Sequence, residues 1–175
     1  MTEPAGNIDE ARFRQILGHF ATGVTVVTGS DEAGDPVGLS VNSFTSVSLD
    51  PPLIAFSVGR SSTTWPRIRV TGRFTVNILG ADQEAVSRRF ASTGTGTGTG
   101  AGGADFDRFD GIGWHPSPAG SPLLEGAIAW VDATVDAEHD AGDHVMVIGR
   151  VTALDVGQEG APLVFYRGGY GRFEL

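Results

Sequence analysis

The chain has 175 residues, 40% of them hydrophobic, and a formal net charge of −9 at neutral pH. These values predict one globular domain over residues 1–175 and exclude a disordered or membrane-embedded chain. The negative charge argues against nucleic acid or an anionic membrane as a partner. Because there is no cysteine, and residues 1–7 do not resemble an export signal, we expect a cytoplasmic protein without disulfides or thiolate metal sites.

The first predicted element is a helix over residues 9–20, where apolar residues recur with the spacing of one helical face. Asn7 and Glu10 resemble a capping box at its start. Strands are expected over 23–28, 37–39, 44–49 and 53–58 from their β-branched and apolar composition, with a glycine-containing turn at 31–35.

Small polar residues fill the stretch from Gly38 to Leu53, where a core strand would carry larger side chains. Its backbone could therefore lie close to a flat polar ligand, and Asn42 can both donate and accept hydrogen bonds. The alternative is a polar edge strand that runs into a loop. Pro51 and Pro52 end the segment, since proline has no N–H for a sheet ladder.

Residues 61–64 all carry hydroxyl groups, and they follow Arg60 and precede Pro66. The proline predicts the start of a short helix that runs to about Val70. Hydroxyls and an arginine at a helix start can bind a phosphate, whereas an ordinary helix cap needs only one of the hydroxyls.

A strand over 73–79 precedes a short helix that we expect Asp82 to cap. Arg88 and Arg89 at its end either complement the helix dipole or clamp a phosphate. Residues 93–103 form a Thr-Gly repeat and predict a flexible loop. Its match to the GxGxxG fingerprint is rejected, because no strand precedes it and every second residue is glycine.

Strict alternation over 127–138, a turn, and a valine-rich return over 144–154 predict a hairpin. A last strand over 162–166 precedes an aromatic tail broken by glycines. The whole pattern predicts an antiparallel barrel or sandwich with a few short helices.

Few side chains suggest direct catalysis, because there is no GxSxG elbow, no Walker lysine motif and no set of residues with metal-ligand spacing. This scarcity is typical of proteins in which a cofactor performs the reaction, and also of binding modules without chemistry. His144, at a turn-to-strand edge after Gly142 and Asp143, is the best single candidate; the alternative is a structural histidine.

Several segments, in this order, resemble the small flavin reductases that supply reduced flavin to two-component monooxygenases, over about residues 13–172. They are residues 20–28, 38–53, 74–79, 89–91, 142–144 and 162–168. The resemblance implies a mainly β, antiparallel Greek-key split barrel that binds FMN, or sometimes FAD, in a homodimer. The Thr-Gly run departs from the family's shorter, more charged connection and is interpreted as an insertion, after which residues 107–111 fit the family again.

Site residues are carried over from this resemblance. It implies contacts with the flavin ring, ribityl chain and phosphate from Ser40, Val41, Asn42, Ser43, Ser57, Val58, Gly59, Ser62, Thr63, Thr64, Arg89, Phe90 and Ala91. His144 would be the catalytic-site residue that contacts NADH or NADPH, with Tyr170 nearby.

The reaction that the resemblance implies is hydride transfer from NADH or NADPH to the flavin, which then leaves for a separate monooxygenase. One alternative is a split-barrel enzyme that retains its flavin and acts on an organic substrate. Others are a non-catalytic flavin-binding protein and a plain structural domain. The sequence leaves FMN versus FAD, NADH versus NADPH and the partner's substrate open.

Overall fold

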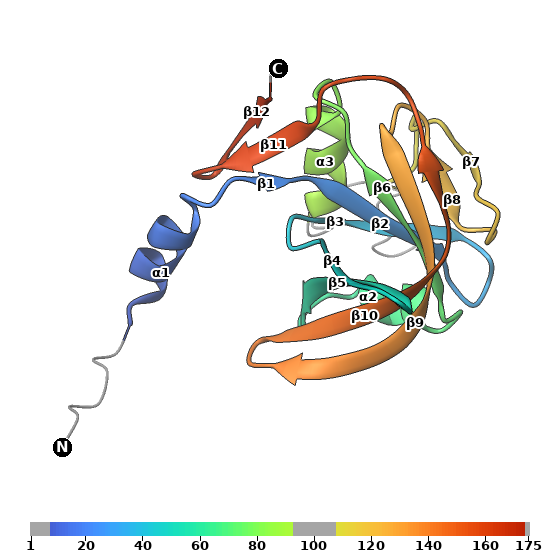
Figure 1. Ribbon diagram of the computed structural model, residues 1–175, viewed down its shortest axis with the longest axis horizontal. Helices are drawn as coiled ribbons and strands as arrows, with labels where there is room; N and C mark the ends of the chain where they lie inside the picture. Colours follow the sequence, from blue (N-terminus) through green and yellow to red (C-terminus); the bar gives the residue numbers. More distant parts are fainter. Residues whose placement is uncertain (1–7, 93–107, 174–175) are drawn as a thin grey trace, which may run out of the picture.

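The computed structural model describes residues 8–92 and 108–173, and it is built around one seven-stranded antiparallel sheet (Figure 1). The strand order is β3-β2-β6-β9-β10-β5-β4. The elements are α1 (Glu10–Leu17), β1 (Thr22–Gly23), β2 (Thr25–Ser30), β3 (Pro36–Val41), β4 (Thr45–Leu49), β5 (Pro52–Gly59), α2 (Trp65–Arg69), β6 (Arg73–Ile78), α3 (Glu84–Ala91), β7 (Trp114–Pro116), β8 (Pro122–Leu124), β9 (Ala129–Ala141), β10 (His144–Val156), β11 (Leu163–Tyr166) and β12 (Gly169–Arg172).

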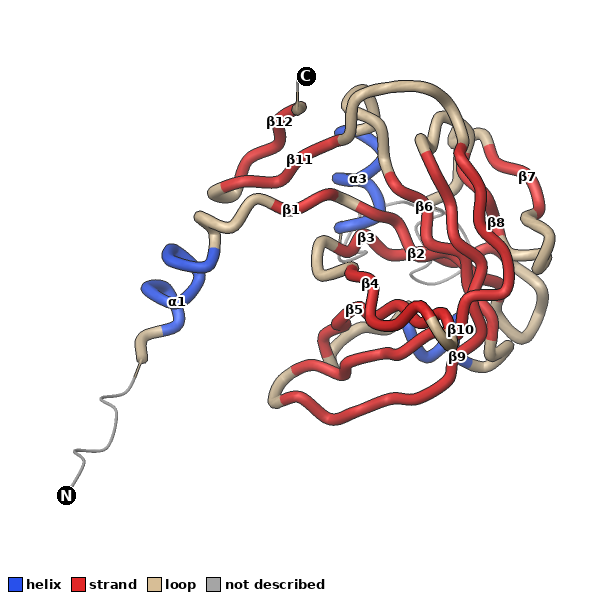
Figure 2. The backbone as a smooth tube through the Cα atoms, in the orientation of Figure 1, coloured by secondary structure: helices blue, strands red, loops and turns tan. Residues whose placement is uncertain are grey.

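The two ends of this sheet, β3 and β4, are consecutive in the chain and are joined only by residues 42–44. The sheet therefore curls until its first and last strands come close, as the tube in Figure 2 shows. Among the described strands, β3 pairs only with β2 and β4 only with β5. The barrel is thus split at the polar stretch, and the mainly β, antiparallel architecture predicted from the sequence is confirmed.

The long hairpin of β9 and β10 forms one wall of the barrel. Its register pairs His144 with Ala141, and shifts of register near Gly149 bend the strands. A Cβ added at Gly149 would lie 2.6 Å from the ring of Phe74, so a glycine lets the strand pass this aromatic side chain. The hairpin predicted from alternation is confirmed, with both strands longer than expected.

Buried apolar side chains form two clusters. In one of them Phe56, Trp65 and Phe74 meet edge to face, with centroids 5.3–6.0 Å apart. Phe90 belongs to the second cluster, which packs between the barrel and the outer elements. A fully buried amide, Asn77, lies on β6 and forms hydrogen bonds with Val26, Thr28 and Leu124.

Four features differ from the expectations. Helix α1 is shorter than residues 9–20, and it is capped by Asp9, whose carboxylate accepts from two backbone N–H groups; Asn7 lies outside the described residues. Asp82 does not cap α3, because that helix begins after Gln83. The β7–β8 hairpin was not predicted. The glycine-broken tail forms strand β12, which pairs with β11.

The predicted Thr-Gly loop at 93–103 also lies outside the described residues. Within the described ranges, no helix is long and apolar enough to cross a membrane.

Candidate flavin site

The centre of the candidate site is the split between β3 and β4. Asn42 and Ser43 lie there and are exposed. The Ser43 hydroxyl accepts from the backbone N–H of Ser57 at 2.8 Å and lies 3.2 Å from its carbonyl oxygen. Two segments assigned to the flavin by resemblance, 40–43 and 57–59, are therefore bonded to each other. The open strand edges beside them leave backbone donors and acceptors for a flat ligand.

A chain of three hydroxyl groups joins the split to the C-terminal hairpin. The oxygens of Ser40 and Ser87 lie 3.1 Å apart, and those of Ser87 and Tyr170 lie 2.9 Å apart. The guanidinium of Arg88 lies over the Tyr170 ring, 4.8 Å from its centroid. The structure thus places Tyr170 beside α3, and it adds Ser87, a fully buried residue that the sequence analysis did not single out.

The predicted phosphate segment divides into residues with different roles. The Ser62 hydroxyl accepts from the backbone N–H of Trp65, so this one side chain provides the helix cap. Thr63 is exposed, whereas Thr64 is only 8% exposed. Arg60 pairs with Asp140 on the β9–β10 hairpin at 2.6 Å, so a role for its charge at this segment stays a prediction.

Arg108, a residue that the sequence analysis did not single out, also lies at this site. Its guanidinium donates to the carbonyl of Gly38 at 2.8 Å, to the hydroxyl of Thr64 at 3.0 Å and to the carbonyl of Ser92. Burial lowers the pKa of Arg108, and the nearby positive charge of Arg67 acts in the same direction. One cation therefore connects β3, the start of α2 and the end of α3.

Helix α3 packs against β3 beside the split. Phe90 is 1% exposed, and a Cβ added at Gly38 would lie 2.8 Å from its ring. The glycine thus allows β3 to lie directly on this aromatic side chain. Arg88 pairs with Glu84 on the same helix at 2.7 Å, and Arg89 lies 4.0 Å from Asp110.

Not all predicted contact residues can present a side chain to a ligand. Val41, Val58 and Phe90 are core residues, so any contact they make with a flavin comes from their backbone. Ala91 is exposed at the end of α3.

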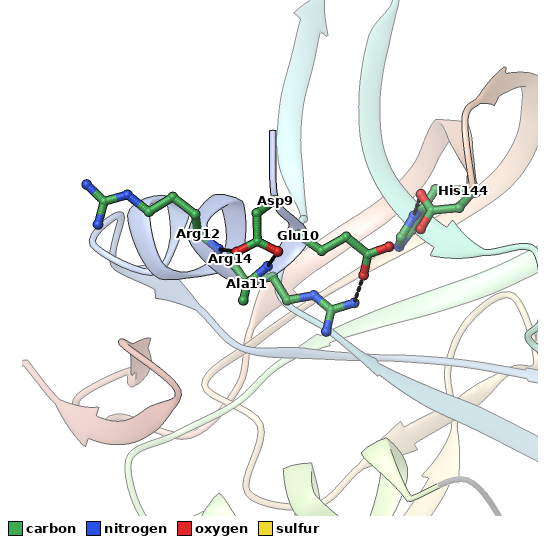
Figure 3. Close-up of polar contacts among 7 residues, drawn as sticks. Asp9, Glu10, Ala11, Arg12, Arg14 and His144 are labelled. Carbon is green, nitrogen blue, oxygen red and sulfur yellow. Dashed lines mark hydrogen bonds and ion pairs between the residues drawn. The ribbon is translucent and has the colours of Figure 1, made fainter. Parts of the chain in front are cut away.

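His144 lies at the tip of the β9–β10 hairpin, opposite Gly59 on β5. Its Nδ1 is 2.8 Å from the carboxylate of Asp143 (Figure 3). This hydrogen bond holds the pKa of Asp143 below its usual value, and the positive charge of Arg14 acts weakly in the same direction. The pair fixes the imidazole beside a segment assigned to the flavin, and α1 lies within electrostatic reach of it.

A cleft of about 520 Å³ adjoins this region, between the start of α2 and the β9–β10 hairpin. It shares Val58, Gly59 and Ser62 with the candidate site, and Glu138 in its wall accepts from the Trp65 indole at 2.7 Å. In the described ranges, no group of three or more His, Cys, Asp or Glu side chains could hold a metal ion.

The fold and the polar opening define a split β-barrel suited to a flat cofactor. A family model described as flavin reductase like domain matches residues 17–174. The chain belongs to this flavin reductase family, and it is an oxidoreductase.

Named relatives agree with this assignment. A flavin reductase of Pseudomonas putida is 47% identical, over 95% of this chain and 91% of that protein. The reductase subunit HsaB of a flavin-dependent monooxygenase from Rhodococcus jostii is 43% identical, over 93% and 77% respectively. The solved structure of the NADH:FAD oxidoreductase SgcE6 of Streptomyces globisporus, with NAD and FAD fragments, has a TM-score of 0.81 at 33% identity, and covers 95% of this chain and 93% of that one.

Proposed function

We propose that the protein is an NAD(P)H-dependent flavin reductase that passes reduced FMN or FAD to a separate monooxygenase. The observation that carries the proposal is the split of the barrel at Ser40 to Ser43, where unpaired strand edges meet small polar side chains. The family match over residues 17–174 supports one flavin reductase-like domain. The naming of one relative as a monooxygenase reductase subunit supports the separate partner, and a cytoplasmic location belongs to the same proposal.

The residues at the split fit a flavin. The ring edge of a flavin both accepts and donates hydrogen bonds, and exposed Asn42 together with the open edges of β3 and β4 offers both kinds of group. The phosphate end needs donors and positive charge, which Thr64 and Arg108 offer. When bound, the flavin accepts a hydride from the nicotinamide.

The protein's own part in this reaction is positioning. Backbone N–H groups near Ser43 would stabilise negative charge on the flavin ring. His144, held by Asp143, would orient the nicotinamide nucleotide against the ring face. No side chain has to act as an acid or base, which agrees with the scarcity of such groups at the split.

Absorbance at 340 nm tests this function directly. We expect purified protein to oxidise NADH or NADPH when FMN or FAD is supplied, with a rate that rises and then saturates with added flavin. Parallel assays with each flavin and each nucleotide show whether the enzyme prefers FMN or FAD, and NADH or NADPH. An enzyme that saturates without added flavin would instead retain its cofactor, and no oxidation with any flavin would refute the proposal.

A homodimer is also part of the proposal. Helix α1 stands away from the barrel in Figure 1, and none of its residues is buried. The exposed apolar side chains on this segment include Phe13 at 55%, Leu17 at 53% and Phe20 at 76%. Such a stripe is costly to leave in water, so we place it against a second copy of the chain.

Introducing negative charges on this apolar stripe tests whether it forms the dimer interface. We expect the double substitution Phe13→Glu and Leu17→Glu to convert the protein from a dimer to a monomer at micromolar concentration, measured by light scattering during gel filtration. The polar-face pair Arg12→Glu and Gln15→Glu is the control and should remain dimeric. An unchanged mass for the first variant would contradict the role given to α1.

A further inference from the structure

We infer that Arg108 is a positioning residue for the flavin phosphate, acting through Thr64 and through its own positive charge. This inference rests on the proposed function and goes beyond the residues assigned by resemblance, none of which is Arg108. It starts from the three segments that the guanidinium joins. Gly38 begins the polar stretch, Thr64 ends the hydroxyl run, and Ser92 directly follows residues 89–91.

The hydrogen bonds of Thr64 leave its hydroxyl hydrogen available as a donor. Thr64 occupies the N-cap position of α2, yet its side chain makes no capping bond, and Ser62 caps the helix instead. The Thr64 oxygen accepts from Arg108, so its own hydrogen must point elsewhere. Within the described residues this O–H has no acceptor, although the side chain is only 8% exposed. A buried O–H of this kind needs an acceptor, and a phosphate oxygen supplies one.

The charge at this place is also suited to an anion. Among the described residues, the partners of Arg108 are two carbonyls and one hydroxyl, and none is a carboxylate. Its neighbour Arg67 is paired with Asp31 at 2.7 Å, but Arg67 still adds positive potential around Arg108. A chain with a net charge of −9 thus has, beside Thr64, a cationic side chain that no carboxylate of the described residues pairs with. Arg60, by contrast, pairs with Asp140.

FMN and riboflavin differ only in the phosphate, so their affinities test this inference. Dissociation constants are measured from the quenching of flavin fluorescence on titration with the protein. For Arg108→Gln we expect FMN binding to weaken about tenfold and riboflavin binding to change less than about twofold. Arg108→Lys, which keeps the charge but not the forked contacts, should fall between that variant and the wild type.

Further variants separate the phosphate role from folding and net charge. Arg150→Gln removes an equal charge from a residue paired with Asp136 and should leave both affinities unchanged. Thr64→Val, which lacks the hydroxyl, should weaken the binding of FMN but not of riboflavin. Thr64→Ser, which keeps the hydroxyl, should bind FMN as the wild type does. If Arg108→Gln fails to fold, as judged by urea unfolding, the Thr64 pair decides the test alone.

The outcomes are distinct. Equal losses for both flavins, or an unchanged FMN affinity in Arg108→Gln and Thr64→Val, would overturn the inference. A wild-type protein that binds FMN and riboflavin equally would overturn it too, while the proposed reductase activity would stand. A wild type that binds neither flavin would overturn the proposed function itself.

Discussion

Replacing His144 with alanine is expected to lower kcat/KM for NADH by about tenfold or more. The imidazole is held by Asp143 at 2.8 Å and lies opposite Gly59, next to a segment assigned to the flavin. Its loss should leave the nicotinamide less well oriented, because the exposed tip of the hairpin offers few other groups at this position. Steady-state rates over a range of NADH concentrations measure the effect.

A histidine outside the site provides the matched control. His115 is exposed on β7, and it does not line the cleft beside the candidate site. His115→Ala should keep kcat/KM within about twofold, and flavin affinity should stay constant in both variants. Equal losses in the two variants would show that the effect is not specific to the His144 side chain.

Replacing Asn77 with alanine is expected to lower the free energy of unfolding by about 3–5 kcal/mol. The Asn77 amide donates to the carbonyl of Val26 at 3.1 Å and to the hydroxyl of Thr28 at 3.0 Å, and it accepts from the N–H of Leu124 at 2.8 Å. Alanine would remove these three hydrogen bonds in a fully buried place and leave the Leu124 N–H without its acceptor, although the Thr28 hydroxyl keeps its bonds to the carbonyls of Thr75 and Pro122. Urea unfolding followed by tryptophan fluorescence measures the change.

A surface asparagine gives the comparison for this measurement. Asn42 is exposed at the split, so Asn42→Ala should change the free energy of unfolding by less than about 0.5 kcal/mol. A loss below about 1 kcal/mol for Asn77→Ala would mean that water or repacking satisfies the groups the amide leaves behind. The β8 strand would then not depend on Asn77 for its attachment to the barrel.

Local patterns account for what the sequence predicts well. Alternation over 127–138 and the valine-rich return define β9 and β10, because a strand with one buried face repeats every two residues. Helical spacing likewise defines α1. That spacing does not say which surface covers the apolar face, and the described residues of the barrel leave it exposed. The β7–β8 hairpin was missed because its three-residue strands carry prolines and little periodicity.

The site is harder to predict, because its key contacts join residues far apart in the chain. Arg60 precedes the hydroxyl run in sequence, but the fold turns it toward Asp140. Arg108 follows the run by more than forty residues, yet it contacts Thr64. Two of its three partners are backbone carbonyls, and a contact with a backbone carbonyl cannot be predicted from the type of residue that carries it. The one available signal was that residues 107–111 fit the family segment.

The bond between Arg108 and Ser92 also has a practical consequence. It brings together the two points at which the chain leaves α3 and rejoins the described structure, on either side of residues 93–107. When the two ends of a connection are already held together, doubling its length costs only about 0.6 kcal/mol in closure entropy. This position should therefore accept an epitope tag or a fluorescent reporter peptide while the barrel keeps its architecture.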